Sequence, residues 1–138
     1  MYTKIAVVVA TLIGVAVIAA LLLMPSGPGR ADLAKVKISP GNDSCSEGSA
    51  SFAISNGSDY AIKYVEFRVW GFTSGSSSKI DVGINLITYD RIAPRQAFSG
   101  CWSLNYQHVP NGQKLTLLEA ETQSVGFVTK SGATKIVY

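Results

Sequence analysis

A single histidine, two cysteines and nine scattered carboxylates are the side chains of this sequence that could do chemistry. His108 lies in the polar stretch 106–110, and a catalytic histidine needs a nucleophile and a carboxylate held beside it. No G-x-S-x-G turn is present, and the acids show neither glycosidase pairing nor a calcium-loop pattern. We therefore expect no catalytic residue, no cofactor and no metal, and a hydrolase is kept only for completeness.

The two cysteines, Cys45 and Cys101, lie far apart and outside any Cys-x-x-Cys or Cys/His ligand spacing, which disfavours zinc. One pair of cysteines in an exported domain most simply forms one disulfide. Closing the loop between Cys45 and Cys101 would stabilise the fold by about 4 kcal/mol in the chain-entropy model. Two unpaired buried thiols are the alternative.

A candidate binding face lies in the longest strand pattern, residues 60–72. Val65, Phe67 and Val69 alternate with a polar and aromatic set, so the two sets occupy opposite faces of a strand. The aromatic rings of the second set could dock a protein or stack on a sugar. This set consists of Tyr64, Glu66, Arg68 and Trp70. For Trp70, packing against the disulfide is an equal alternative.

The other tryptophan, Trp102, follows Cys101 directly. We expect Trp102 to pack on the disulfide, as a tryptophan does in antibody-type domains.

The elements that position these residues are strands, because alternating patterns recur between turn signals and no helix-forming stretch is present. Ile62 is out of phase with Val65, which predicts a bulge near Lys63. We predict a single all-β sandwich of about seven strands. The expected ranges are 34–39, 50–55, 60–72, 80–87, 97–104, 115–127 as one bent strand or two, and 135–138.

The core and turn pattern resembles a known family. The run Phe52-x-Ile54-x-Asn56-x-Ser58, followed by Ile62-x-x-Val65-x-Phe67-x-Val69, is similar to small bacterial immunoglobulin/fibronectin-III-like domains of the FxLYD and CARDB kind. The stretch Ile92-Ala93-Pro94-Arg95-x-x-x-Ser99 resembles their I-x-P-G-x-S segment, with Arg95 where glycine is usual. The resemblance covers about residues 49–127 and implies an immunoglobulin/fibronectin-III-like sandwich that binds or spaces. It carries no catalytic residue across.

An apolar run precedes this domain. Residues 5–24 carry no charge and are long enough to cross a bilayer, and the Pro/Gly-rich residues that follow cannot continue a helix. We predict a transmembrane anchor or uncleaved signal in 1–24, a Pro/Gly linker in 25–32 and an extracytoplasmic head in 33–138. Cleavage of a signal peptide after Ala31 is the alternative. Ala6, Ala10 and Gly14 form a smooth stripe on which a partner helix could pack.

Two arguments on orientation disagree. Arg30, Lys35 and Lys37 follow the apolar run and outnumber Lys4 before it, which would leave the head in the cytoplasm. The cysteine pair favours export. We follow the cysteines and expect a single-pass inner (plasma) membrane protein with a cytoplasmic N-terminus and a periplasmic head.

The charge of the head nearly balances, with ten cations against nine acids in residues 31–138. From this balance we expect no nucleic-acid binding and no basic patch for anionic lipid. The leading hypothesis is a non-enzymatic membrane-anchored interaction module, an accessory or assembly subunit that contacts a membrane protein through helix and head. The alternative is an exported ligand- or glycan-binding module that uses the aromatic face.

Overall fold

The computed structural model describes residues 27–138, so the predicted anchor 1–24 and its Ala6/Ala10/Gly14 stripe lie outside the described residues. Within residues 27–138, none of the helical structure is long and apolar enough to span a bilayer. Residues 27–138 form one short helix and seven strands, and the number of strands confirms the prediction. They are α2 (Arg30–Leu33), β1 (Val36–Pro40), β2 (Ser49–Asn56), β3 (Ile62–Thr73), β4 (Ile80–Thr88), β5 (Ala97–Ser103), β6 (Leu115–Val128) and β7 (Thr134–Val137).

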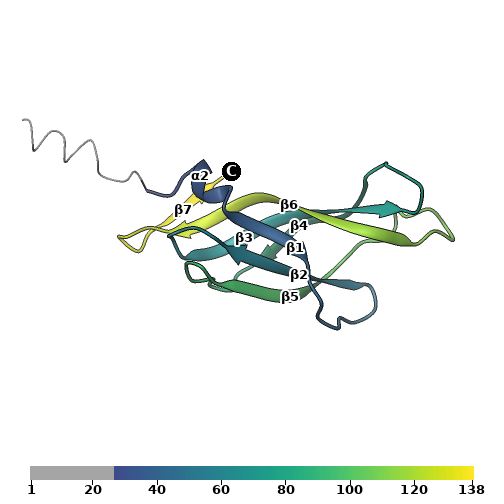
Figure 1. Cartoon of the computed structure of the whole chain (residues 1–138), viewed down its shortest axis with the longest axis horizontal. Helices are drawn as coiled ribbons and strands as arrows, with labels where there is room; N and C mark the ends of the chain where they lie inside the picture. Colours follow the sequence, from purple (N-terminus) through teal and green to yellow (C-terminus); the bar gives the residue numbers. More distant parts are fainter. Residues whose placement is uncertain (1–26) are drawn as a thin grey trace, which may run out of the picture.

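The strands form two antiparallel sheets that stack as two layers (Figure 1). One sheet has the order β1-β2-β5 and the other has the order β4-β3-β6-β7. Apolar side chains from both sheets fill the space between the layers, because alternate residues of each strand point inward. The prediction of an all-β sandwich is confirmed. The buried core consists of Val36, Phe52, Ile54, Ile62, Val65, Phe67, Val69, Val82, Ile92, Leu104, Val125, Phe127 and Val137.

The disulfide between Cys45 and Cys101 is present, as predicted. Along β5 exposed and half-buried residues alternate, with Cys101 exposed and Trp102 half-buried. The indole of Trp102 meets the rings of Phe67 and Phe52 at centroid distances of 5.2 Å and 6.1 Å. Cys101 and Trp102 therefore point to opposite sides of β5, and the prediction that Trp102 packs on the disulfide is wrong. Adjacent residues of a strand cannot share a face.

Three details of the secondary structure can be compared with the sequence-based predictions. The chain makes one turn of helix, α2, where no helix was expected, and Leu33 packs against the core. The pairing of β3 with β6 shifts register between Ile62 and Tyr64, which confirms the bulge near Lys63. Residues 115–128 form a single long strand, β6.

The sandwich has two ends that differ in what they carry. We call the end that holds residues 27–35, 57–63, 89–96 and 129–135 the linker end, because the described chain begins there (Figure 1). The distal end holds the loops 41–48, 74–79 and 104–114. Each strand runs from one end toward the other, so neighbouring turns along the chain alternate between the two ends.

A buried asparagine holds the linker end together. Asn56 is fully buried, and its side-chain nitrogen lies 2.8 Å from the carbonyl oxygen of Tyr60 and 3.1 Å and 3.2 Å from those of Ala93 and Ile92. Its side-chain oxygen accepts a 2.7 Å hydrogen bond from the Ser58 hydroxyl. One buried side chain thus satisfies carbonyls from two separate turns.

Candidate functional site

The predicted binding face lies on the outside of the four-stranded sheet. Along β3 the inward residues Val65, Phe67 and Val69 are fully buried, whereas Tyr64, Glu66, Arg68 and Trp70 are half-buried. The structure therefore brings the four predicted residues onto one outward face. Their partners across the sheet on β6 are, in the same order, Gly126, Ser124, Glu121 and Glu119.

Charged groups surround Trp70. The guanidinium carbon of Arg68 lies 4.9 Å from the centroid of the indole ring, and the Lys79 ammonium lies 5.7 Å from it. The indole N–H donates a 3.1 Å hydrogen bond to Glu121. Lys79 also pairs with Glu119 at 3.8 Å. Two cations and a carboxylate therefore hold the indole ring in place, and its surface is not left uncovered for a ligand to stack on.

A carboxylate on β4 also contacts Arg68. Its terminal nitrogen lies 3.2 Å from a carboxylate oxygen of Asp81 on β4. The Nε atom of Arg68 and the second oxygen of Asp81 are buried and have no hydrogen-bond partner among the residues that the structure describes. This single-contact ion pair fixes the guanidinium beside Trp70 without satisfying either group fully.

Tyr64 is the second aromatic residue of the same face. Its ring lies across Gly126 of β6, where any added side chain would collide with it. The ring of Tyr89 is 6.5 Å away by centroids, and the Ser124 hydroxyl donates a 2.9 Å hydrogen bond to Glu66 nearby. Burial raises the pKa of the Tyr64 phenol above its ordinary value, and the charges of Tyr138 and Glu66 raise it further.

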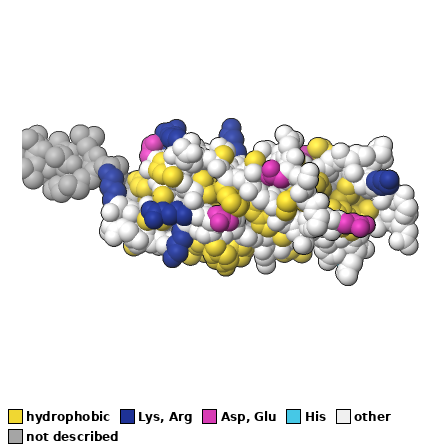
Figure 2. Space-filling view, turned by 90° about the horizontal axis from the view of Figure 1, so that it is seen from below, with side chains coloured by type: hydrophobic (Ala, Val, Ile, Leu, Met, Phe, Trp, Pro, Cys, Tyr) yellow, Lys and Arg dark blue, Asp and Glu magenta, His cyan; other side chains and the backbone are white. Residues whose placement is uncertain are grey.

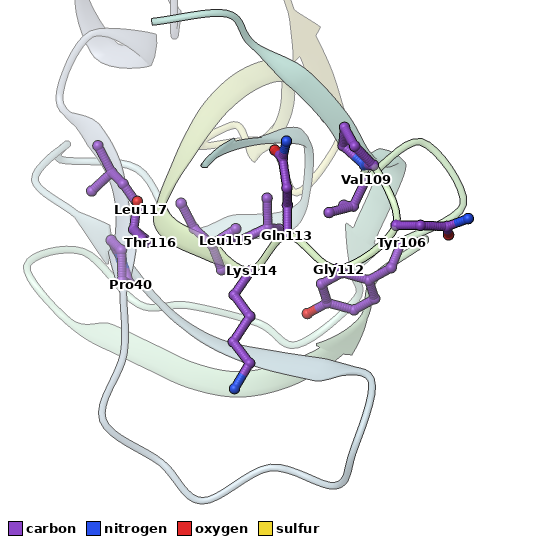
Figure 3. Close-up of a pocket in the computed structure, with 12 residues that line it drawn as sticks. Pro40, Tyr106, Val109, Gly112, Gln113, Lys114, Leu115, Thr116 and Leu117 are labelled. Carbon is purple, nitrogen blue, oxygen red and sulfur yellow. The ribbon is translucent and has the colours of Figure 1, made fainter. Parts of the chain in front are cut away.

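An apolar groove at the distal end was not predicted from the sequence. It has a volume of about 680 Å³ and is lined mainly by the loop 106–114 and the first residues of β6. Figure 3 shows Pro40 and Leu117 on one side of the groove and Tyr106 and Val109 on the other. Leu117 and Tyr106 are 52% and 41% exposed, so the groove presents apolar surface to solvent.

The groove adjoins an unpaired strand edge. β3 pairs with one edge of β6 along most of its length, but β7 covers the other edge only over Val125–Val128. In the part of the chain that the structure describes, no strand pairs with that edge of residues 115–124. Its backbone N–H and C=O groups therefore have no strand partner in residues 27–138, and β1 of the other sheet packs against β6. A pattern of alternation predicts β6 but cannot show how far its neighbour β7 extends.

His108, the histidine considered as a possible catalytic residue, is exposed in the loop 104–114. It lines a small hollow of about 210 Å³ together with Asp81 and Asn105. No ion pair or hydrogen bond of residues 27–138 joins an acid to His108. Nor do three or more histidine, cysteine or acidic side chains gather closely enough in this range to hold a metal ion.

Cations of the described chain gather at the linker end. The linker end carries seven cations against three acids, whereas the rest of the described chain carries four cations against six acids. The expectation that a balanced total leaves no basic patch is therefore wrong, because folding gathers cations from distant parts of the sequence. The linker-end cations are Arg30, Lys35, Lys63, Arg91, Arg95, Lys130 and Lys135. Figure 2 shows dark-blue side chains gathered where the described chain begins.

Comparison with known proteins adds no assignment. No family model, no curated protein and no solved structure matches this chain.

Proposed function

We propose that the protein is a membrane-anchored, extracytoplasmic contact module without enzymatic activity, which serves as an accessory or assembly subunit of a larger membrane complex. Residues 1–24 anchor it in the inner (plasma) membrane with the N-terminus in the cytoplasm. The Cys45–Cys101 disulfide supports an oxidising compartment for the head.

The observation that carries this proposal is the open β6 edge beside the distal groove. An exposed edge supplies backbone hydrogen bonds to an extended segment, and adjacent apolar pockets accept its alternate side chains. The groove provides such surface around Tyr106 and Leu117. Both features lie at the end away from the anchor, where a partner's soluble domain can reach them.

We further propose that the sandwich is of the immunoglobulin/fibronectin-III-like kind, related to FxLYD and CARDB domains. If the strands are lettered A, B, C, C′, E, F and G in chain order, the sheets become A-B-E and C′-C-F-G. Immunoglobulin-type domains likewise set a sheet containing A, B and E against one containing C, F and G. This agreement of strand order supports the resemblance.

A photo-crosslinking residue at Leu117 tests the contact surface in the full-length chain within its own membrane. We expect a discrete crosslinked product with a membrane protein, because Leu117 lies in the groove and is half exposed. The same residue at Ser99, exposed on the outside of β5, is the matched control and should give none. Equal crosslinking from both positions would contradict a specific site in the groove.

The anchor is tested separately by Gly14→Leu. Filling the stripe should weaken co-purification with the partner in mild detergent while the head still folds, because a bulky side chain separates packed helices. Val15→Leu, outside the stripe, is the control. Unchanged co-purification of the Gly14→Leu variant would remove the stripe from the proposal.

The alternative, a ligand- or glycan-binding module on the aromatic face, has less support. A sugar stacks on an uncovered ring, but Arg68 lies over the ring of Trp70 and Glu121 binds its N–H. A glycan would have to displace these contacts first.

A further inference from the structure

We propose that the linker end of the head docks onto anionic phospholipid headgroups of the membrane that holds the anchor. The inference rests on the proposed function in one respect, namely that residues 1–24 lie in a bilayer. It adds a second contact with that bilayer, made by the folded head.

The linker end keeps most of its positive charge unneutralised. Only two of its seven cations have a carboxylate within ion-pair distance among the described residues: Lys35 with Asp32 at 3.4 Å and Arg95 with Asp59 at 2.6 Å. The segment that precedes residue 27 contains no acid. Five exposed cations therefore lie free at this end: Arg30, Lys63, Arg91, Lys130 and Lys135.

Two of these five cations, Arg91 and Lys130, line a hollow that suits a headgroup. It has a volume of about 650 Å³, and Lys35, Arg91 and Lys130 line it from three separate segments of the chain. The acids in its wall are Asp32 and Asp59, which the two ion pairs already occupy. A phosphate that enters the hollow thus meets Arg91 and Lys130 without an unpaired carboxylate from the wall.

The length of the connection keeps this surface close to the membrane. Three residue steps separate Met24 from Gly27, which is at most about 11 Å of extended chain. Screening in physiological salt has a length of about 8 Å, so the attraction acts over a comparable distance. The distal end carries no net charge, with Asp43 and Glu47 against Lys79 and Lys114, so an anionic surface does not attract it. Both effects favour an upright head whose distal groove faces away from the bilayer.

Energy transfer from the full-length chain to a headgroup dye tests this docking. The chain is reconstituted in vesicles of phosphatidylcholine alone and in vesicles with about 30% phosphatidylglycerol. A fluorophore at Ser131, in a turn of the linker end, reports the approach of this end, and one at Ser77 reports the distal end. We expect phosphatidylglycerol to raise transfer from Ser131 and not from Ser77, and high salt to reverse the rise.

Two double variants separate local charge from total charge. Arg91→Gln with Lys130→Gln should lower the ratio of docked to undocked heads by more than about ten-fold, since each cation contributes near a charged surface. Lys79→Gln with Lys114→Gln removes as much charge from the other end and should leave docking unchanged.

The outcomes distinguish the two proposals. Chains that float with neutral vesicles but show equal transfer in both lipids, or equal effects of the two double variants, would overturn the docking alone. Chains that fail to float with neutral vesicles would overturn the anchor and the tethered docking together.

Discussion

At the linker end a buried asparagine joins two turns by hydrogen bonds, whereas at the distal end a disulfide ties the loop 41–48 to the surface of β5. The first end is closed, polar inside and positively charged outside. The second keeps an apolar groove and an unpaired edge of β6. The two ends of one sandwich thus differ in surface chemistry and are each held by a different kind of bond.

Removing the disulfide should have the largest effect on this comparison. Reduction, or Cys45→Ser with Cys101→Ser, should lower the free energy of unfolding by about 4 kcal/mol, because the sequence separation is 56 residues and the unfolded chain gains entropy. Urea unfolding measures the change. Hydrogen exchange should show the loop 41–48 losing protection while the turns of the linker end keep theirs. An unchanged unfolding midpoint after reduction would show that the bridge does not stabilise the head.

Asn56→Ala should disturb the opposite end. We expect a loss of about 3 kcal/mol, because three backbone carbonyls lose the donor of one buried side chain at once. Asn105→Ala in a distal loop is the matched control, since the Asn105 side chain accepts one exposed hydrogen bond from the backbone of Gln107. Its cost should stay within about 0.5 kcal/mol. Similar losses in the two variants would mean that the buried network does not set the linker end apart.

Arg95→Gly should give a smaller effect of opposite sign. Arg95 adopts a left-handed backbone with φ 62°, which strains a residue that has a side chain. Its ion pair with Asp59 is exposed and contributes little. We expect a net gain of less than about 1 kcal/mol. Asn85→Gly, at φ 53° in β4, should gain less because asparagine tolerates this conformation, and a larger gain at position 85 would contradict the argument.

Alkaline pH should have the smallest effect on the free energy of unfolding. It should act through Tyr64 on the outer face of the four-stranded sheet. The pKa of Tyr64 is raised on folding, so the folded state favours the neutral phenol. This preference is fully present below the ordinary phenol pKa of about 10 and is lost as the pH rises through the folded value. Unfolding of the native chain should therefore become easier above pH of about 10. Tyr64→Phe should reduce that slope, and an identical slope would remove Tyr64 as its source.

The strands and the inward faces were predictable because they depend on local alternation. Phe67 and Val69 face the core as the pattern required, and Trp70 lies on the outer face. The disulfide followed from the number of cysteines and the expected compartment. These features need no knowledge of which strands become neighbours.

What could not be predicted depends on pairing between distant segments. The distal groove requires Pro40 and Leu117 to meet, and the open edge of β6 requires that β7 be short. The basic end requires Lys35, Arg91 and Lys130 to converge from three parts of the chain. The sequence predicts the wrong neighbour for Trp102, because residues that are adjacent in a strand point to opposite faces.

The two exposed glutamates of β6, Glu119 and Glu121, give the open edge a bias against self-association. If two copies paired antiparallel about Ala120, Glu119 of each would lie opposite Glu121 of the other, at about 5 Å between Cβ atoms. Such like-charge pairs are unfavourable, so the edge discourages aggregation into extended sheets. A strand with lysine or arginine at the facing positions would meet no such repulsion. The charge of these two side chains thus favours a basic strand over a second copy of the same edge as a partner.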